Sequence, residues 1–262
     1  MSRPQSYILC TSPRSGSTLL CTLLRESGVA GYPESWFHRP SLVGWAKDLE
    51  IPLPKGSEPA KIATLIAAAK DKGRANGALF ALRLQRQSAP FFLQMLARLH
   101  PDLRHDRDRL RACFGETRFL YLNRSDKIAQ AVSYMRAQQT GLWHRAADGS
   151  ELERLASHRE PYYDHAFLAQ WVKTFTQYEA RWRTWFARER ITPYALSYDT
   201  LSNDPTGCLR AVLAALSLTP PKRQDISPGV QRLSDNLSAE WIERFKRENR
   251  ATGTKPPGKP NH

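Results

Sequence analysis

The stretch CTSPRSGSTLL (residues 10–20) contains the most informative turn of this chain. The short apolar run Tyr7–Cys10 comes directly before the turn and predicts a buried strand, and leucines at helical spacing follow it over residues 17–26. Pro13 and Gly16 mark a tight turn between the two elements. Backbone amides of such a turn, with the free N–H groups at a helix start, bind anions. The sequence therefore predicts a strand–loop–helix unit that holds a phosphate-like group.

The loop departs from the P-loop pattern GxxxxGK[ST] of nucleotide-binding proteins at its lysine. When Gly16 is aligned with the second glycine, Thr11 replaces the first glycine, Ser17 replaces the lysine and Thr18 keeps the hydroxyl. Loss of the lysine disfavours ATP or GTP hydrolysis, whereas Arg14 offers a guanidinium for the oxygens of a transferred group. The alternative is an ordinary turn, rich in Ser and Thr because these residues cap helices.

Strands and helices alternate along the rest of the chain. Strands are expected at 78–84, 117–122 and 193–198, and helices at 40–48, 59–73, 89–99, about 127–139 and 205–217. The alternation predicts an α/β fold, a P-loop-like three-layer α/β/α arrangement around a central, mainly parallel sheet. Ligands of such sheets gather at the carboxyl ends of the strands, where the loops at 11–17 and 123–126 are expected.

Three further segments complete this organisation. A long helix after residue 160 carries an aromatic stripe, which we expect in the core. The polar segment 144–160 is expected to be an exposed insertion. Residues 1–249 are expected to form a single domain, and the tail 250–262, rich in Pro, Gly and Lys, is expected to be disordered.

Composition narrows the function classes. The formal net charge is +14, which favours a nucleic acid, an anionic membrane surface or a small polyanion as partner. Arg and Lys are spread along the whole chain, which weakens the nucleic-acid alternative. The four cysteines are scattered without a CxxC pair, so neither a zinc site nor a disulfide framework is indicated. We expect a cytoplasmic protein, because neither a membrane span nor a signal peptide is evident.

The loop and a second segment resemble a known family. TSPRSGSTLL, after the first strand, resembles the 5′-phosphosulfate loop of sulfotransferases that use 3′-phosphoadenosine 5′-phosphosulfate (PAPS). YLNRSDKIAQAVSYMRAQQTGLW, residues 121–143, resembles their 3′-phosphate segment, with Arg124 and Ser133 at the matching positions. The resemblance implies a sulfotransferase fold and a PAPS site made by Ser12, Pro13, Arg14, Ser15, Gly16, Ser17, Thr18, Arg124 and Ser133.

More narrowly, the chain resembles the bacterial Stf0 type, which includes trehalose 2-sulfotransferases and NodH-like carbohydrate sulfotransferases. The supporting segments are AGYPESWF (30–37), NGALFALRL (76–84), QAVSYMRAQQTGLW (130–143) and QRLSDNLSAEWIERF (231–245). In the last segment Arg232 and Ser238 match polar positions, but Leu237 replaces an expected arginine. The resemblance implies transfer of a sulfuryl group to a sugar or glycolipid hydroxyl without a metal.

Sulfuryl transfer needs a base for the acceptor proton. The resemblance implies a glutamate, but Ser35 holds the family's position and Glu34 lies one place early. A slip of one residue in an extended segment reverses the side-chain direction. Glu34 is nevertheless the expected base, and His38 is its rival.

The remaining expected roles divide between charge and acceptor contacts. Arg14 is the expected catalytic cation. The expected acceptor contacts are Glu34, Trp36, Phe37, Arg83 and Trp143. Contact with a membrane through a lipid-linked acceptor, and a homodimer, are compatible with the sequence, and no nucleic-acid partner is expected. A kinase-like nucleotide-binding protein, a basic binder of nucleic acid or anionic surfaces, and a sulfotransferase-like protein without catalysis stay as alternatives.

Overall fold

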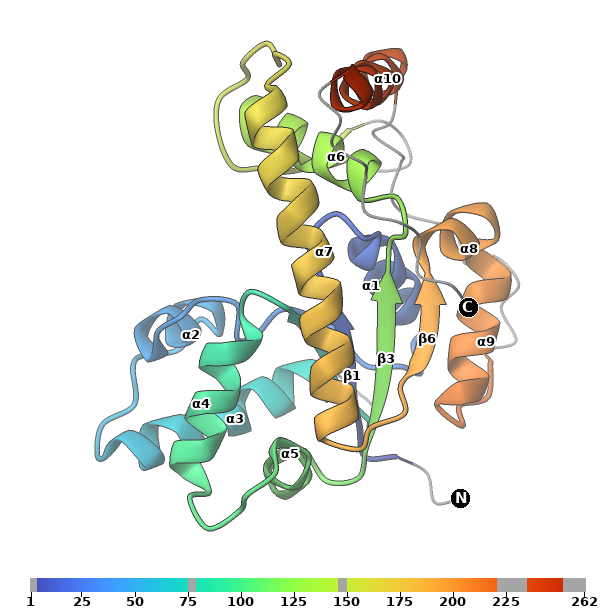
Figure 1. Ribbon diagram of the computed structural model, residues 1–262. Coiled ribbons are helices and arrows are strands. Elements are labelled where there is room, and N and C mark those ends of the chain that lie inside the picture. The colour runs from blue at the N-terminus through green and yellow to red at the C-terminus, as the bar shows by residue number, and fades with distance from the viewer. Residues whose placement is uncertain (1–3, 75–78, 146–149, 221–234, 252–262) are drawn as a thin grey trace.

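A computed structural model describes residues 4–74, 79–145, 150–220 and 235–251. Its central sheet is entirely parallel within these residues and has the strand order β2-β1-β3-β6 (Figure 1). The strands are β1 (Ser6–Thr11), β2 (Phe80–Gln85), β3 (Thr117–Asn123) and β6 (Tyr194–Ser197). β1 is central and pairs with β2 and β3, so the loop after it leaves from the middle of the sheet.

Ten helices of the described chain surround this sheet and extend beyond it. They are α1 (Ser17–Glu26), α2 (Leu42–Asp48), α3 (Glu58–Arg74), α4 (Ala89–Leu99), α5 (Asp106–Phe114), α6 (Lys127–Thr140), α7 (His165–Arg188), α8 (Tyr198–Asn203), α9 (Pro205–Ala215) and α10 (Asn236–Ala251). A strand–helix alternation in the sequence therefore gives the predicted α/β architecture.

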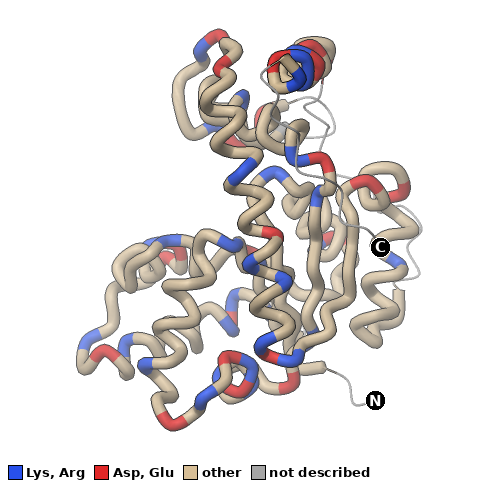
Figure 2. Tube along the Cα trace, in the orientation of Figure 1, with Lys and Arg blue, Asp and Glu red and all other residues tan. Residues whose placement is uncertain are grey.

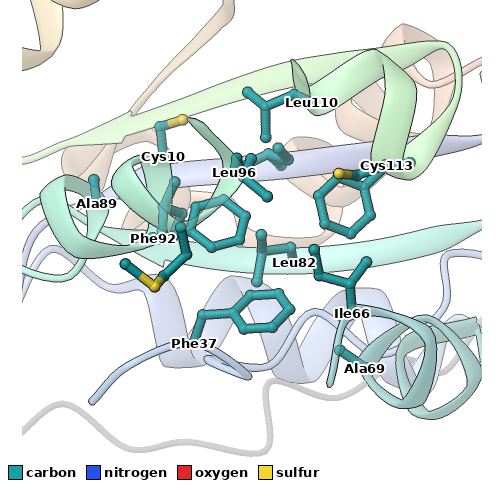
Figure 3. Packing of buried hydrophobic residues seen from close by; sticks show 14 of the residues in the cluster. Cys10, Phe37, Ile66, Ala69, Leu82, Ala89, Phe92, Leu96, Leu110 and Cys113 are labelled. Atoms are coloured by element: carbon teal, nitrogen blue, oxygen red, sulfur yellow. The ribbon is translucent and has the colours of Figure 1, made fainter. Parts of the chain in front are cut away.

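The two faces of the sheet carry separate hydrophobic cores, because successive strand residues point to opposite faces. Ile8 and Cys10 of β1 join a core with residues of α2, α3, α4, α5 and the end of α7. Figure 3 shows this packing, with Phe92, Leu82 and Leu110 among the side chains. Tyr7 and Leu9 point to the other face, where α1 and α9 cover the sheet. The predicted three-layer α/β/α fold is confirmed.

Helix α7 connects the sheet to a third core beyond its carboxyl end. Trp182 and Phe186 near its end pack on the sheet, whereas Leu168, Val172 and Phe175 near its start pack against α6 and α10. The aromatic stripe is therefore core, as predicted. Figure 1 shows α6, α10 and the start of α7 beyond the ends of the strands, while the rest of α7 runs alongside the sheet.

Several segments differ from the sequence prediction. The region 144–160, predicted as an exposed insertion, also contains regular structure, because β4 (Leu142–Arg145) and β5 (Glu151–Arg154) pair antiparallel there. The segment around Glu34 bridges Leu82 in parallel and so extends the sheet edge. Helix α10 continues to Ala251, two residues past the predicted end of the domain. The rest of the predicted tail lies outside the described residues.

Charge is distributed rather than concentrated. Figure 2 shows Lys and Arg interspersed with Asp and Glu over most helices. Many pairs are in contact on the surface, such as Arg98 with Glu58 at 2.6 Å and Lys72 with Glu50 at 2.8 Å. In the described part of the chain, no helix has the length and apolarity needed to cross a membrane.

Candidate active site

A cleft of about 1270 Å³ opens at the carboxyl edge of the sheet. The loop after β1, the end of β2, helix α6, the β4–β5 hairpin and the start of α10 line it. This is the edge at which parallel sheets bind ligands, because the loops that leave the strands converge there. The loops at 11–17 and 123–126 both reach this edge, as the sequence predicts.

Buried hydrogen bonds fix the shape of the loop after β1. The Ser15 hydroxyl donates to the Ser12 carbonyl oxygen at 2.8 Å and lies 2.5 Å from the Thr11 hydroxyl. Gln130 of α6 donates from Nε2 to the Ser12 hydroxyl at 3.0 Å and to the Pro13 carbonyl at 2.6 Å. Ser12 and Ser15 thus use their side chains to hold the loop, and their backbones are the parts available to an anion.

Two residues of this loop have left-handed backbones. Arg14 has a φ of 60°, and Gly16, which precedes α1, has a φ of 87°. A Cβ on Gly16 would lie 2.7 Å from Cδ2 of Tyr198, so only glycine fits this close approach. A left-handed arginine costs about 1–2 kcal/mol, and such strain is concentrated at functional sites. Successive turns of this kind aim backbone N–H groups at one point and form an anion nest.

Arg14 crosses from the loop to α6 and the hairpin. Its Nε donates to the Ser133 hydroxyl at 3.0 Å, and its Nη1 donates to the Trp143 carbonyl at 2.5 Å. Burial and the neighbouring Arg124 lower the pKa of Arg14 to about 10, which still leaves it charged near neutral pH. The structure thus brings together Arg14, Ser133 and Trp143, which are far apart in the sequence.

Arg124 lies beside the same loop. Its Nη1 donates to the Arg14 carbonyl at 3.3 Å, and its guanidinium stacks 4.3 Å from the ring centre of Tyr198. Lys127 supports this turn by donating to the Arg124 carbonyl and forming a 2.7 Å ion pair with Glu179 of α7. Arg14, Arg124 and Ser133, predicted to bind one donor, therefore line one wall of the cleft.

The opposite wall is organised by Arg83 at the end of β2. Arg83 donates from Nε to the Ser35 hydroxyl at 2.8 Å and from Nη1 to the Thr18 hydroxyl at 3.1 Å. Its Nη2 lies 3.6 Å from Glu34, whose other carboxylate oxygen lies 3.6 Å from Arg25. Among the described residues, Ser35 and Arg83 line the cleft and Glu34 does not.

Trp36 and Phe37, the two aromatic residues that follow Ser35, pack in or against the hydrophobic core and do not line the cleft. Phe37 is 1% exposed and stacks on Phe92 with ring centres 4.8 Å apart. The expected contact between Phe37 and the acceptor is corrected, because the side chain is enclosed by the core. Trp36 packs against the same core and donates from Nε1 to the Ala81 carbonyl at 3.3 Å. Trp36 is also not among the described residues that line the cleft.

His38 does line the cleft. Its Nδ1 lies 3.1 Å from the Ser88 hydroxyl, which precedes α4. Burial, with a smaller contribution from Arg83, lowers the pKa of His38. His38 is therefore available as a neutral imidazole, whereas the expected base Glu34 is engaged by two arginines.

Sequence reasoning missed two residues of the cleft and one residue that supports its loop. Gln130 holds the loop, and His144 and Glu153 come from the hairpin. His144 Nε2 lies 3.0 Å from the Thr18 hydroxyl and 3.4 Å from Glu153. Burial and then the charges of Arg14 and Arg83 lower the pKa of His144 to about 3. The sequence signal for the hairpin was Asp148-Gly149, a dipeptide typical of hairpin turns, between the segments 142–145 and 151–154.

Helix α10 borders the outer side of the cleft. Arg136 of α6 forms a two-pronged ion pair with Asp235, at 2.5 and 2.8 Å, and donates to the Ser238 hydroxyl at 2.5 Å. Leu237 also lines the cleft, whereas Arg232 lies outside the described residues. Among the residues described, no cluster of three or more His, Cys, Asp or Glu side chains has the arrangement of a metal site.

The half-buried Arg14 lies on a strand–loop–helix turn that has no lysine at Ser17. The chain matches the family model described as Stf0 sulphotransferase over residues 6–248, and it belongs to that family. The resemblance noted from the sequence and the sulfotransferase fold are both confirmed.

Two relatives are similar over nearly their whole length. Trehalose 2-sulfotransferase from Mycolicibacterium smegmatis is 30% identical, with 95% of this chain and 97% of the relative covered. Trehalose 2-sulfotransferase from Mycobacterium tuberculosis is 28% identical, with 92% and 94% covered. The chain therefore aligns with complete sulfotransferases rather than with a part of one.

Proposed function

We propose that this protein transfers the sulfuryl group of PAPS to a hydroxyl of a carbohydrate, with trehalose or a similar sugar as the first acceptor to test. The observation that carries the proposal is the half-buried Arg14, which links the loop after β1 to Ser133 of α6 beside Arg124. Family membership supports the reaction class. The names of the two relatives support the sugar.

The donor would use the wall of the cleft that contains the loop. The backbone of residues 12–18 and the start of α1 would bind the 5′-phosphosulfate, since turn amides and helix starts favour anions. Arg124 and Ser133 would bind the 3′-phosphate by charge and hydrogen bonding. The absence of a lysine at Ser17 supports a sulfuryl rather than a nucleoside-triphosphate donor.

Charge stabilisation would come from Arg14 on the donor side and Arg83 on the opposite wall. A transferring sulfuryl group carries negative charge on its oxygens, and fixed cations in a water-poor cleft stabilise it strongly. Arg14 is already held by two hydrogen bonds, so little reorganisation is needed during transfer. Arg83 is held in the same way by Ser35 and Thr18.

The acceptor would lie between Arg83, His38 and the β4–β5 hairpin. The polar side chains of His38, Arg83, His144 and Glu153 line the cleft there, which suits a sugar with many hydroxyls. Trp143 lines this region and remains our proposed aromatic contact for the sugar ring. A glycolipid acceptor would place its lipid outside the cleft.

The donor site is tested by calorimetry with 3′-phosphoadenosine 5′-phosphate, ADP and AMP, without added metal. We expect the 3′-phosphorylated ligand to bind at least about tenfold more tightly, since a charge-assisted phosphate contact contributes about 1.5–3 kcal/mol. Arg124→Ala should remove most of that preference. Arg98→Ala is the matched control, because Arg98 lies on α4 and pairs with Glu58.

Turnover is then measured with PAPS and trehalose by mass spectrometry of the sugar. A mass increase corresponding to one sulfuryl group supports the whole proposal. Equal binding of the three nucleotides by the wild-type protein would contradict the PAPS donor. Donor preference without sulfation of trehalose would contradict only the acceptor.

A further inference from the structure

We infer that His144 accepts the proton of the acceptor hydroxyl, and that Glu153 stabilises the imidazolium that results. This inference rests on the proposed sulfuryl transfer and adds a residue that the sequence resemblance did not supply. It is based on position, hydrogen-bond direction and the charges around the imidazole. Each of these is independent of the acceptor's identity.

Position is the first observation. The β4–β5 hairpin carries His144 to the start of α1, where Nε2 lies 3.0 Å from the Thr18 hydroxyl. Thr18 is part of the loop–helix junction that binds the donor's sulfuryl end in the proposed function. Trp143, the preceding residue, accepts a hydrogen bond from Arg14 through its carbonyl. The imidazole therefore lies within reach of both the reacting anion and the acceptor space.

The contact with Thr18 is compatible with a neutral ring whose Nε2 is unprotonated. Arg83 Nη1 can only donate, so the Thr18 oxygen accepts from it at 3.1 Å. The single proton of Thr18 is then free to point to His144 Nε2. In that arrangement Nε2 is an acceptor and Nδ1 carries the ring proton. A neutral imidazole with an unprotonated Nε2 in the cleft is the form that a general base needs.

The charged groups that face the imidazole come from three elements. Arg14 from the loop and Arg83 from β2 disfavour a positive ring, and with burial they lower the pKa of His144 to about 3. Glu153 from β5 lies 3.4 Å from Nε2 and favours a positive ring. A bound sulfonate and phosphate would offset the two arginines, so donor binding should raise the pKa of His144. The base would become strong only when the donor is in place.

The two bases predicted from the sequence are less well placed. Glu34 lies 3.6 Å from both Arg25 and Arg83, outside the described cleft lining. Its position suits a residue that holds Arg83 rather than one that touches the acceptor. His38 lines the cleft, but its contact is with Ser88 at 3.1 Å, on the side of α4.

The proposed step forms one bond, breaks one bond and transfers one proton. The acceptor oxygen forms a bond to sulfur while the bond between sulfur and the 5′-phosphate oxygen breaks. The hydroxyl proton moves to Nε2 of His144. The products are a sulfate ester, 3′-phosphoadenosine 5′-phosphate and an imidazolium beside Glu153, and the imidazolium returns its proton to solvent.

The test is His144→Gln, whose amide can replace the contact with Thr18 but cannot take a proton. Single-turnover rates with PAPS and the sugar are measured from pH 5 to pH 9. We expect the wild-type rate to fall at low pH, because protonated His144 cannot act as a base. The variant should lose about 10²–10⁴-fold in rate and should lack this low-pH decrease. Binding of 3′-phosphoadenosine 5′-phosphate should stay within about threefold, an effect of less than 1 kcal/mol.

Two further variants make the outcome specific. His105→Gln is the matched control, because His105 lies before α5 and pairs with Glu189 away from the cleft. Glu153→Gln should move the low-pH decrease to lower pH by about one unit or less, since removal of a partly exposed carboxylate lowers the imidazole pKa. Wild-type rates and an unchanged pH profile in His144→Gln would overturn the inference. The proposed function would still stand, because its tests are donor preference and sulfation of the sugar by the wild-type protein.

Discussion

The two walls of the cleft are built in different ways. The donor wall consists of a buried loop whose side chains bond to one another and to α6, so its geometry is fixed before any ligand arrives. The acceptor wall consists of a hairpin and the segment around Ser35, whose side chains are partly exposed and joined mainly through Arg83. In the proposed function, the donor would therefore be bound by a preformed loop, whereas the acceptor would be bound by elements that tolerate variation.

Arg14→Ala should have the largest effect, because it removes the cation of the rigid wall. We expect kcat/KM to fall by about 10³-fold, the loss seen when one preorganised charge or donor at a transition state is removed. Steady-state rates with PAPS measure it, and Arg98→Ala supplies the control. A fall below tenfold would mean that Arg14 contributes little to transition-state stabilisation and that Arg83 carries the charge.

Gly16→Ala tests the rigidity of the same wall. The added Cβ would lie 2.7 Å from Tyr198 and would force φ of +87° on an alanine, so we expect the free energy of unfolding to fall by about 2–3 kcal/mol. Urea denaturation measures this. Gly28→Ala is the matched control, because Gly28 has φ of +70° but no neighbour within 4 Å of the added atom.

Gly28→Ala should therefore cost only the backbone strain, about 1–2 kcal/mol. If the two variants lose equal stability, Tyr198 moves aside without cost and the donor wall is less rigid than its contacts suggest. In that case the affinity for 3′-phosphoadenosine 5′-phosphate should also be unchanged in Gly16→Ala.

Asp235→Asn should have the smallest effect, because it alters an exposed contact at the outer border. The ion pair with Arg136 lowers the pKa of Asp235, so its contribution to stability is present above about pH 4 and is lost as pH falls through the lowered value. We expect a loss of about 0.2–1 kcal/mol at pH 7, since half-exposed pairs are screened. Urea denaturation at pH 7 and pH 3 measures it, and the difference between wild type and variant should be smaller at pH 3 than at pH 7.

The same contrast between the walls explains what the sequence could predict. The donor wall depends on local order: strand, turn, helix start, and an arginine after the third strand. Such short-range patterns have a direct structural meaning, so Arg14, Arg124 and Ser133 were all placed in the cleft that the structure forms. The parallel order of the sheet followed in the same way from alternation of strands and helices.

The acceptor wall depends on contacts that the sequence does not encode locally. An aromatic residue beside a polar segment can either contact a sugar or pack in the core, so the sequence alone does not assign Phe37. The packing against Phe92 assigns it to the core. His144 lies in a polar segment for which the sequence predicts only an exposed insertion, and pairing of this segment in a hairpin brings His144 to Thr18. Glu34, the expected base, stays a prediction.

The hairpin has a consequence for changing what the protein sulfates. One strand supplies both the carbonyl that Arg14 contacts and the imidazole that meets Thr18. Replacement of this hairpin by that of a relative would therefore change binding of the proposed donor as well as the choice of sugar. In the described contacts, the segment between His38 and α3 does not contact both Arg14 and Thr18 as the hairpin does. New acceptor specificity is therefore more readily introduced in that segment.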